Sequence, residues 1–210
     1  LTIPSWTSGV TNTSVEINNS ASVAGTAIAA WDNGNLAIAW TRPIYGGTTQ
    51  HVLALSIYDG SSWTTQDIDT ASRTGYRPSI AIDNQGALHI AYLDRDNTNL
   101  RYATNASGSW VLSTLDTSSV NPNNDAAKTG IAIDNRGHVH IIHPVQGSSV
   151  WVLNYTTNVS GSFVSTTITD TTKDDGKYAS LAIAGNGSLH ISVYRDTGGS
   201  DLRYYPDESG

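Results

Sequence analysis

One block of sequence is written four times along the chain. Its copies read TAIAAWDNGNLAIAW at 26–40, SIAIDNQGALHIAY at 79–92, GIAIDNRGHVHIIH at 130–143 and SLAIAGNGSLHISV at 180–193. The turn glycines Gly34, Gly86, Gly137 and Gly187 are 52, 51 and 50 residues apart. A constant period of this size, built from alternating short strands, is typical of a propeller or another repeat array. The repeat constrains the architecture far more than the activity.

The second copy serves as the template for the local structure. Residues 79–83 alternate small and large side chains, which predicts a strand, and the following turn contains Gly86, which takes positive φ at little cost. A second strand at 87–93, a polar loop at 94–99 and a third strand at 99–104 follow, and a fourth strand starts at Ser109-Trp110. Four antiparallel strands per 50 residues make one propeller blade. The sequence therefore predicts an all-β fold, a four-bladed β-propeller.

The last blade lacks a fourth strand before Gly210, whereas Ser5-Trp6 and the strand-like SVEIN at 14–18 lie at the other terminus. We expect this N-terminal strand to complete the last blade, because closure removes the open edges that invite aggregation. The alternative is a fragment of a longer propeller. The single domain 1–210 then divides into blades at about 22–70, about 76–118, about 127–170, and about 178–210 plus 1–18.

Composition excludes several partners. The chain has 18 acidic and 11 basic residues and a net charge of −7, which disfavours nucleic acid because phosphate binding needs clustered Lys and Arg. No run approaches the roughly 20 apolar residues of a membrane-spanning helix, so we expect no membrane insertion. Absent Met and signal peptide, few Lys and many small polar residues favour a processed protein that is secreted or on the cell surface. Six glycosylation sequons fit that location: Asn12, Asn18, Asn105, Asn154, Asn158 and Asn186.

Three histidines, His89, His140 and His190, each follow a turn glycine by three residues, and Ala37 takes that place in the first blade. Three imidazoles are a known zinc ligand set. However, equivalent positions in separate blades should lie too far apart to share one ion. We therefore expect each histidine to bond a neighbouring strand or loop. No cofactor is predicted, although main-chain carbonyls along the axis leave open a cation in the central channel.

Small and aromatic residues also recur at fixed positions. We expect the small residues Ala29, Ala81, Ala132 and Ala182 to line a crowded axis. We expect the aromatics Trp6, Trp63, Trp110 and Phe163 to pack between blades, with sugar stacking as the alternative. Trp31 replaces the aspartate found at Asp83 and Asp134, so the first blade is specialised there.

Loops held by a rigid scaffold are the favoured place for function. The loops that enter the inner strands and those that link second to third strands carry most of the cations. The candidate ligand-binding residues in these loops are Tyr76, Arg77, Arg95, Asp96, Lys128, Tyr178, Arg195 and Asp196. A basic rim on an acidic protein would suit an acidic group such as a sugar carboxylate. The alternative is that Arg95 pairs with Asp96, and Arg195 with Asp196, at the surface, where such pairs contribute little.

The blocks SIAIDNQGALHIAYLD, NLRYAT and GSW resemble the repeats of secreted bacterial β-propeller proteins, which are loosely grouped with the sialidase-type Asp-box repeat. The best match to an Asp box runs from Tyr58 to Trp63 (YDGSSW). The resemblance covers essentially the whole chain and implies a propeller fold. The arginine triad of the sialidase site has no match in this sequence.

Catalytic patterns are sparse. A glycosidase normally needs two positioned carboxylates, and the only glutamates, Glu16 and Glu208, lie near the termini. The sequence leaves open whether the protein is an enzyme and favours a binding role. The leading hypothesis is an extracellular recognition module that binds glycan or an extracellular protein through one loop face. The alternatives are a structural subunit of a surface layer, fibre or adhesin, which would self-assemble, and a carbohydrate-active hydrolase or lyase.

Overall fold

Four antiparallel sheets make up the fold in a computed structural model that describes residues 25–44, 50–118, 127–147, 150–196 and 200–206. The first sheet contains β1 (Thr26–Ala30), β2 (Leu36–Pro43), β3 (His51–Tyr58) and β4 (Trp63–Asp69). The second contains β5 (Tyr76–Ile82), β6 (Leu88–Asp94), β7 (Asn99–Thr104) and β8 (Val111–Asp116). The third contains β9 (Gly130–Ile133), β10 (Val139–Gln146), β11 (Trp151–Thr157) and β12 (Val164–Thr167). The fourth contains β13 (Lys177–Ile183), β14 (Leu189–Arg195) and β15 (Asp201–Pro206).

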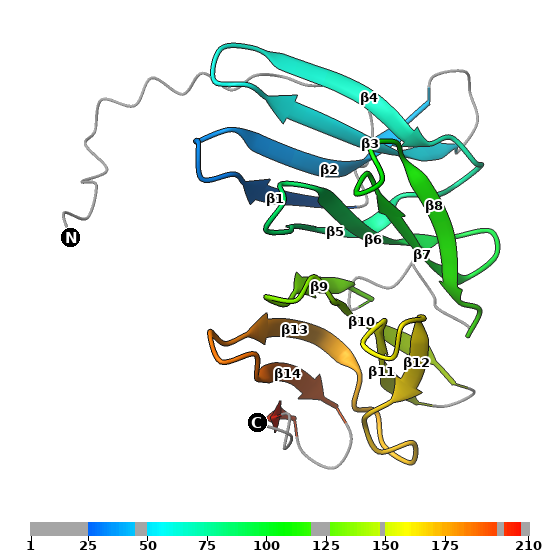
Figure 1. The fold of residues 1–210 in the computed structure, drawn as a ribbon. Helices are drawn as coiled ribbons and strands as arrows, with labels where there is room; N and C mark the ends of the chain where they lie inside the picture. The colour runs from blue at the N-terminus through cyan, green and yellow to red at the C-terminus, as the bar shows by residue number, and fades with distance from the viewer. Residues whose placement is uncertain (1–24, 45–49, 119–126, 148–149, 197–199, 207–210) are drawn as a thin grey trace, which may run out of the picture.

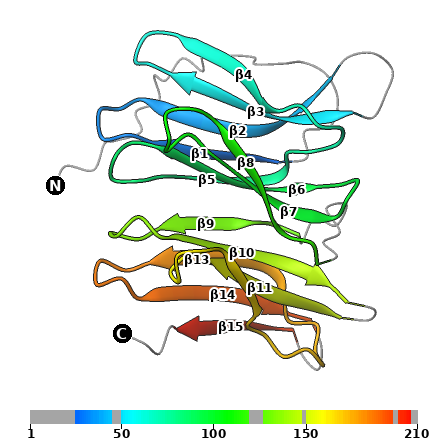
Figure 2. The same ribbon diagram turned by 45° about the vertical axis from the view of Figure 1, so that its right-hand side comes forward.

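The sheets stack face to face in chain order, and the first and the fourth lie at opposite ends of the stack (Figures 1 and 2). Their inner strands are neighbours, with β1 packed on β5, β5 on β9 and β9 on β13. The all-β, blade-like organisation predicted from the repeat is confirmed. The strand proposed to close the ring, within residues 1–18, lies outside the described residues. No described helix is long and apolar enough to cross a membrane.

Each inner hairpin is set by the chemistry of its turn. In the second sheet the Asp83 carboxylate accepts the backbone N–H groups of Gln85 and Ala87 at 2.9 and 2.8 Å, and Gly86 takes a φ of +83°. Asp134 repeats this arrangement in the third sheet with Arg136 and His138. Because the turns match, the registers match. The inner-strand alanines pair with the repeat position of the second strand: Ala29 with Ala37, Ala81 with His89, Ala132 with His140 and Ala182 with His190.

The apolar core consists of three clusters, one between each pair of neighbouring sheets. Trp110 from the second sheet packs between the first and second sheets, and Phe163 from the third packs between the second and third. The Phe163 ring lies 5.3 Å from that of Tyr102. For these two aromatics the prediction of packing between blades is confirmed. Trp63 instead packs on Tyr58 of its own sheet, and Trp6 lies outside the described residues.

Polar bonds link neighbouring sheets next to the apolar clusters. Asp69, at the end of the first sheet, accepts a 2.7 Å hydrogen bond from the Tyr92 hydroxyl of the second. The equivalent Asp116 bonds His143 Nε2 of the third sheet at 3.0 Å. Both aspartates are buried, so each sheet is oriented on the next by a bond with defined geometry.

The repeated histidines each bond a tyrosine on the third strand of their own sheet. His89 Nδ1 lies 2.5 Å from the Tyr102 hydroxyl, and the equivalent distances from His140 to Tyr155 and from His190 to Tyr204 are both 2.6 Å. The predicted structural role is therefore confirmed. In the first sheet Ala37 stands in the histidine position and Leu55 in the tyrosine position, so both partners are replaced together. The described residues contain no cluster of His, Cys, Asp or Glu that would hold a metal ion.

These pairs predict unequal effects for one substitution. Tyr102 is 5% exposed, and burial raises the pKa of its phenol to about 12, whereas Tyr204 is 59% exposed. Tyr102→Phe leaves the buried His89 Nδ1 without its partner, while Nε2 keeps Asp83, and should cost about 1–2 kcal/mol of unfolding free energy. Tyr204→Phe should cost only a few tenths, about 0.5 kcal/mol at most, because water replaces the lost partner. Urea denaturation of both variants measures the difference, and equal losses would contradict it.

The structure separates the sequon asparagines. Asn105 and Asn158 are equivalent, and their side chains accept the N–H groups of Leu88 and Val139, so these two sequons arise from a repeated turn. Asn154 is buried and its amide donates to Asp116 and accepts from Thr167, which leaves no room for a glycan. Glycosylation of Asn154 stays a prediction, and the burial and hydrogen bonds of its side chain disfavour it. Asn186 is exposed in a turn, and Asn12 and Asn18 lie outside the described residues.

Candidate functional site

The loops selected from the sequence lie along one side of the stacked sheets, at the ends of their strands (Figure 2). Two backbone bonds join an entering loop to a linking loop there: Arg95 N–H donates to Arg73 O at 3.0 Å, and Asp196 N–H donates to Asp174 O at 2.9 Å. We call this side the loop face and define it by residues 73–78, 94–97, 127–129 and 174–178 with Arg195 and Asp196. The turns between the inner two strands of each sheet lie on the opposite side (Figure 2).

Two equivalent loop-face residues, Arg77 and Tyr178, have unusual backbone conformations. Their φ angles are +50° and +52°, in the left-handed region that residues with a side chain rarely adopt. Each lies in a register shift of its inner strand, between Tyr76 and Ser79 in β5 and between Lys177 and Ser180 in β13. Such bulges redirect a side chain, and strained residues gather at ligand sites.

The neighbouring sheets hold Arg77 in this conformation. The Thr129 hydroxyl, which precedes β9, donates to Arg77 O at 2.7 Å and lies 2.9 Å from the Ser79 hydroxyl. On the other side a Cβ on Gly25 would approach Arg77 Cα to 3.1 Å, so the first sheet starts directly against the bulge. The loop face is thus preorganised by contacts between sheets.

Tyr76 supports its neighbours. It is 4% exposed, so its ring offers little surface to a ligand. Its hydroxyl lies 2.8 Å from His51 Nδ1 and accepts a hydrogen bond from Arg95 Nη1 at 3.2 Å, and the Arg95 guanidinium lies 5.6 Å from the ring centre. Tyr76 therefore positions Arg95 and His51. The sequence predicts Tyr76 and Arg95 as separate candidates, and the structure brings them into contact.

The fourth-sheet part of the loop face combines an aromatic with an ion-pair cluster. The Tyr178 ring is 54% exposed and meets Tyr194 edge to face, with ring centres 6.0 Å apart. Lys177 Nζ lies 2.6 Å from Asp174 and 3.0 Å from Asp196. Partial burial would lower the pKa of Lys177, but the bonds to the two carboxylates outweigh it and raise the pKa.

The loop-face aspartates pair with cations other than their sequence neighbours. Asp96 pairs with Arg73 at 2.9 Å, and Asp196 pairs with Lys177. Arg195 forms a two-pronged contact with Asp201 at 3.1 and 2.6 Å, so it faces its own hairpin. Lys128, at the position equivalent to Arg77 and Tyr178, is exposed.

The structure therefore groups the candidates into two sets and adds residues that sequence reasoning missed. Tyr76, Arg77 and Arg95 lie on the second sheet and its loops, and Tyr178 and Asp196 on the fourth. The missed residues are His51, Arg73 and Asp174, whose partners Tyr76, Asp96 and Asp196 lie 22 to 25 residues away. The only local signal was their position in the same set of loops.

Trp31, which the sequence marked as a departure from the repeat, lies on the opposite side. Its indole N–H donates to Gly86 O at 3.0 Å, so it joins the first inner turn to the second. Beside it is a polar hollow of about 480 Å³, whose lining includes Asp32, Asn33, Asp83 and Asn84. Trp31 thus links the first sheet to the second, whereas the equivalent residues Asp83 and Asp134 cap their own turns.

Comparison with known proteins places the fold. No protein-family model and no curated protein matches the chain. A protein of unknown function from Dyadobacter fermentans superposes with a TM-score of 0.63 and 12% identity, over 90% of this chain and 66% of that one. An α-L-arabinanase from Penicillium chrysogenum, in complex with arabinobiose, superposes with a TM-score of 0.58 and 14% identity, over 88% of this chain and 62% of that one. The polysaccharide lyase Uly1 superposes with a TM-score of 0.55 and 13% identity, over 87% of this chain and 52% of that one.

The likeness is one of fold. With identities of 12–14%, it supports a propeller-like arrangement of the four sheets and carries no residue roles across. The chain spans about two thirds or less of the length of these three structures.

Proposed function

We propose that the protein is an extracellular recognition module that binds acidic carbohydrate through its loop face. The observation that carries the proposal is the pair of strained, equivalent residues Arg77 and Tyr178. Each costs on the order of 1–3 kcal/mol of backbone strain that the surrounding structure must offset. A half-buried guanidinium and an exposed aromatic ring at equivalent loop-face positions suit a carboxylated sugar, since the guanidinium pairs with the carboxylate and the ring stacks on the apolar sugar face.

The setting of these residues supports the same ligand class. Lys128 adds a third side chain at the equivalent position of the intervening sheet, and Arg95 is held nearby by Tyr76. The loop face carries six basic and five acidic residues and is close to neutral, whereas the whole chain has a net charge of −7. Two of the structures with a similar fold are a polysaccharide lyase and an arabinanase in complex with a sugar, so this type of fold occurs in proteins that act on carbohydrate. The finer assignments, a single domain with four blades and a ring closed by the N-terminal strand, are also proposals.

Binding assays on a panel of neutral and uronate-containing oligosaccharides test the proposal. We expect binding of acidic members, weakened by salt because the contact is ionic. Arg77→Ala and Tyr178→Ala should each weaken affinity by at least about tenfold, which corresponds to about 1.4 kcal/mol. Arg136→Ala on the opposite side and Tyr58→Ala on an outer hairpin are the matched controls and should change affinity less than about twofold. No binding by the native protein, or unchanged binding by both loop-face variants, would refute the proposal.

The same panel tests the hydrolase or lyase alternative. The loop-face carboxylates of Asp96, Asp174 and Asp196 each pair with a cation. These three carboxylates are engaged in ion pairs, and nothing in their contacts sets one of them apart as a general acid. We therefore expect the oligosaccharides to be recovered intact. Shortened or unsaturated products that disappear in Asp174→Asn would replace the binding proposal by a catalytic one.

A further inference from the structure

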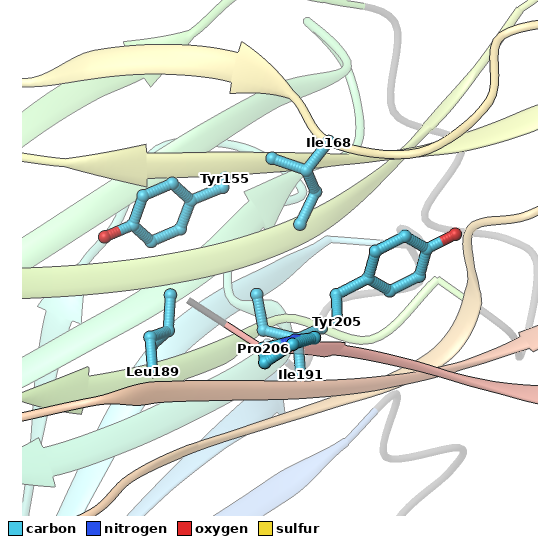
Figure 3. A pocket seen from close by; sticks show the side chains of 6 residues that line it. All are labelled: Tyr155, Ile168, Leu189, Ile191, Tyr205 and Pro206. Carbon is cyan, nitrogen blue, oxygen red and sulfur yellow. The ribbon is translucent and has the colours of Figure 1, made fainter. Parts of the chain in front are cut away.

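An apolar pocket of about 300 Å³ lies between the third and fourth sheets. Its walls come from β11, β14, β15 and the segment after β12 (Figure 3). The lining residues are Tyr155, Ile168, Leu189, Ile191, Tyr205 and Pro206.

The other two sheet interfaces show what normally fills this place. Phe163, which comes just before β12, packs against Tyr102 in the second interface, and Trp110, just before β8, packs in the first. Tyr155 is the repeat equivalent of Tyr102, and Ile191 is that of Ile141. The pocket is therefore the place of an aromatic side chain from the outer strand of the fourth sheet, which has three strands within the described residues.

Among the described strands none pairs with the outer edge of β15, and the side chains on this strand show the same gap. Leu202 and Tyr204 on this strand are 77% and 59% exposed, whereas their equivalents Leu100 and Tyr102 on β7, which β8 covers, are 0% and 5% exposed. An exposed apolar edge strand is a template for pairing with another strand.

The N-terminal sequence matches the outer strands in detail. Trp63 and Trp110 are each followed six residues later by an Asp-Thr pair, at Asp69 and Asp116, and Trp6 is followed six residues later by Asn12-Thr13. In the structure these aspartates close the outer strand, because their carboxylates accept the N–H groups of Ala71 and Ser118. Asparagine supplies the same acceptor. Trp6 also precedes Gly25, at the start of the first sheet, by 19 residues, close to the 18 that separate Trp110 from Lys128.

We propose that residues 6–12 of the same chain form the fourth strand of the last sheet, with the Trp6 indole in this pocket. The register follows from the repeat. Since Thr157 pairs with Val164 in the third sheet, and Thr104 with Val111 in the second, Pro206 faces Thr7. The proposed closing strand is then Trp6–Asn12, and a capping role for Asn12 would leave its side chain unavailable to a glycan.

Cross-linking tests the register directly, since the chain has no cysteine of its own. The double variant Thr7→Cys/Pro206→Cys places two thiols on directly opposite residues, where Cα atoms lie about 4.5–5.5 Å apart and a disulfide can form. We expect an internal disulfide in most of the protein after mild oxidation, visible as faster migration of the unreduced monomer. Thr157→Cys/Val164→Cys, a pair seen in the third sheet, is the positive control. Ser8→Cys/Pro206→Cys is the negative control, because a shift of one residue turns the side chain to the other face.

Two outcomes would overturn the proposal. One is no disulfide in Thr7→Cys/Pro206→Cys while the positive control forms its own. The other is a disulfide-linked dimer whose yield rises with protein concentration, which would assign the pocket to the N-terminal strand of a second copy.

Thermal unfolding gives an independent readout of the indole. Trp6→Ala should lower the melting temperature by about 10 °C, since it empties a buried aromatic site. Trp6→Phe should retain most of the native melting temperature, because Phe163 fills the equivalent place in the third sheet. A melting temperature of Trp6→Ala equal to that of the native protein would refute burial of Trp6. Neither experiment depends on the proposed ligand.

Discussion

Replacing Asp116 by alanine should lower the free energy of unfolding by about 3–5 kcal/mol, a large part of the stability of a typical domain. The Asp116 carboxylate is the shared acceptor of a polar network between the second and third sheets. Its Oδ2 atom bonds His143 Nε2 at 3.0 Å, Asn154 Nδ2 at 2.9 Å and the Ser165 hydroxyl at 2.7 Å. Alanine leaves the buried His143 and Asn154 without this acceptor, whereas the half-buried Ser165 keeps the Thr156 hydroxyl as a partner.

The network also predicts how the protein responds to acid. Burial alone would raise the pKa of Asp116, but hydrogen bonds from His143, Ser118 and Ser165 outweigh it and hold the pKa well below its usual range. A carboxyl whose pKa is lowered by folding stabilises the protein fully above its unfolded pKa, near 4. This stabilisation is lost as the pH falls from there towards the folded pKa. We expect native stability to fall below about pH 4, and that fall to be smaller in Asp116→Asn.

Urea denaturation at neutral and acidic pH measures both effects. Thr114→Ala, an exposed change on the same strand, is the matched control and should stay within about 0.5 kcal/mol of the native protein. If Asp116→Ala were as stable as this control, the network would contribute nothing to the interface. If Asp116→Asn lost stability on acidification as steeply as the native chain, the acid response would belong to other carboxyls.

Substituting Gly75 by alanine should cost about 4 kcal/mol, for two separate reasons. Gly75 has a φ of +77°, and a Cβ there would lie 2.6 Å from both the Cα and the N of Leu53, a backbone that cannot move aside. Gly75 also directly precedes Tyr76 and Arg77. Besides losing stability, the variant should therefore displace the loop face and weaken any ligand bound there.

Gly34→Ala separates the two causes. Gly34 has a similar φ of +88°, but nothing lies within 4 Å of its added Cβ. This control should cost only about 1–2 kcal/mol, from backbone strain alone. Melting temperatures and urea midpoints of the two variants provide the comparison. Equal losses would show that the contact with the backbone of Leu53 relaxes and that conformation alone makes Gly75 necessary.

The repeat was sufficient to predict strands, turns and the general architecture. Alternation with a period of two and turn glycines at a constant spacing are local signals, and each sheet repeats them. The same logic correctly assigned His89, His140 and His190 to structure, since a residue demanded by packing recurs in every sheet. It could not indicate that the side chain of Asn154 is buried, because a sequon is a local pattern whereas burial is decided by a neighbouring sheet.

The candidate site was predicted only in its location. The loops carrying Arg77 and Tyr178 could be placed on one side of the fold, but nothing in the sequence indicates a positive φ at either residue. At Arg77 the hydroxyl of Thr129, which lies 52 residues further along the chain, donates a hydrogen bond to the backbone carbonyl. Likewise, the burial of Tyr76 beneath Arg95 follows from the register of two strands and a linking loop.

The sequence by itself determined the four sheets, their hairpins and the residues that repeat, because these follow from interactions within about 50 residues. Only the tertiary structure decided how one sheet meets the next. It shows that Asp116 binds partners 27, 38 and 49 residues away and that Arg77 and Tyr178 have strained backbones. It also shows an apolar pocket beside β15. The physical reason is that pairing within a hairpin is fixed by turn chemistry, whereas contact between sheets depends on how separate apolar faces pack.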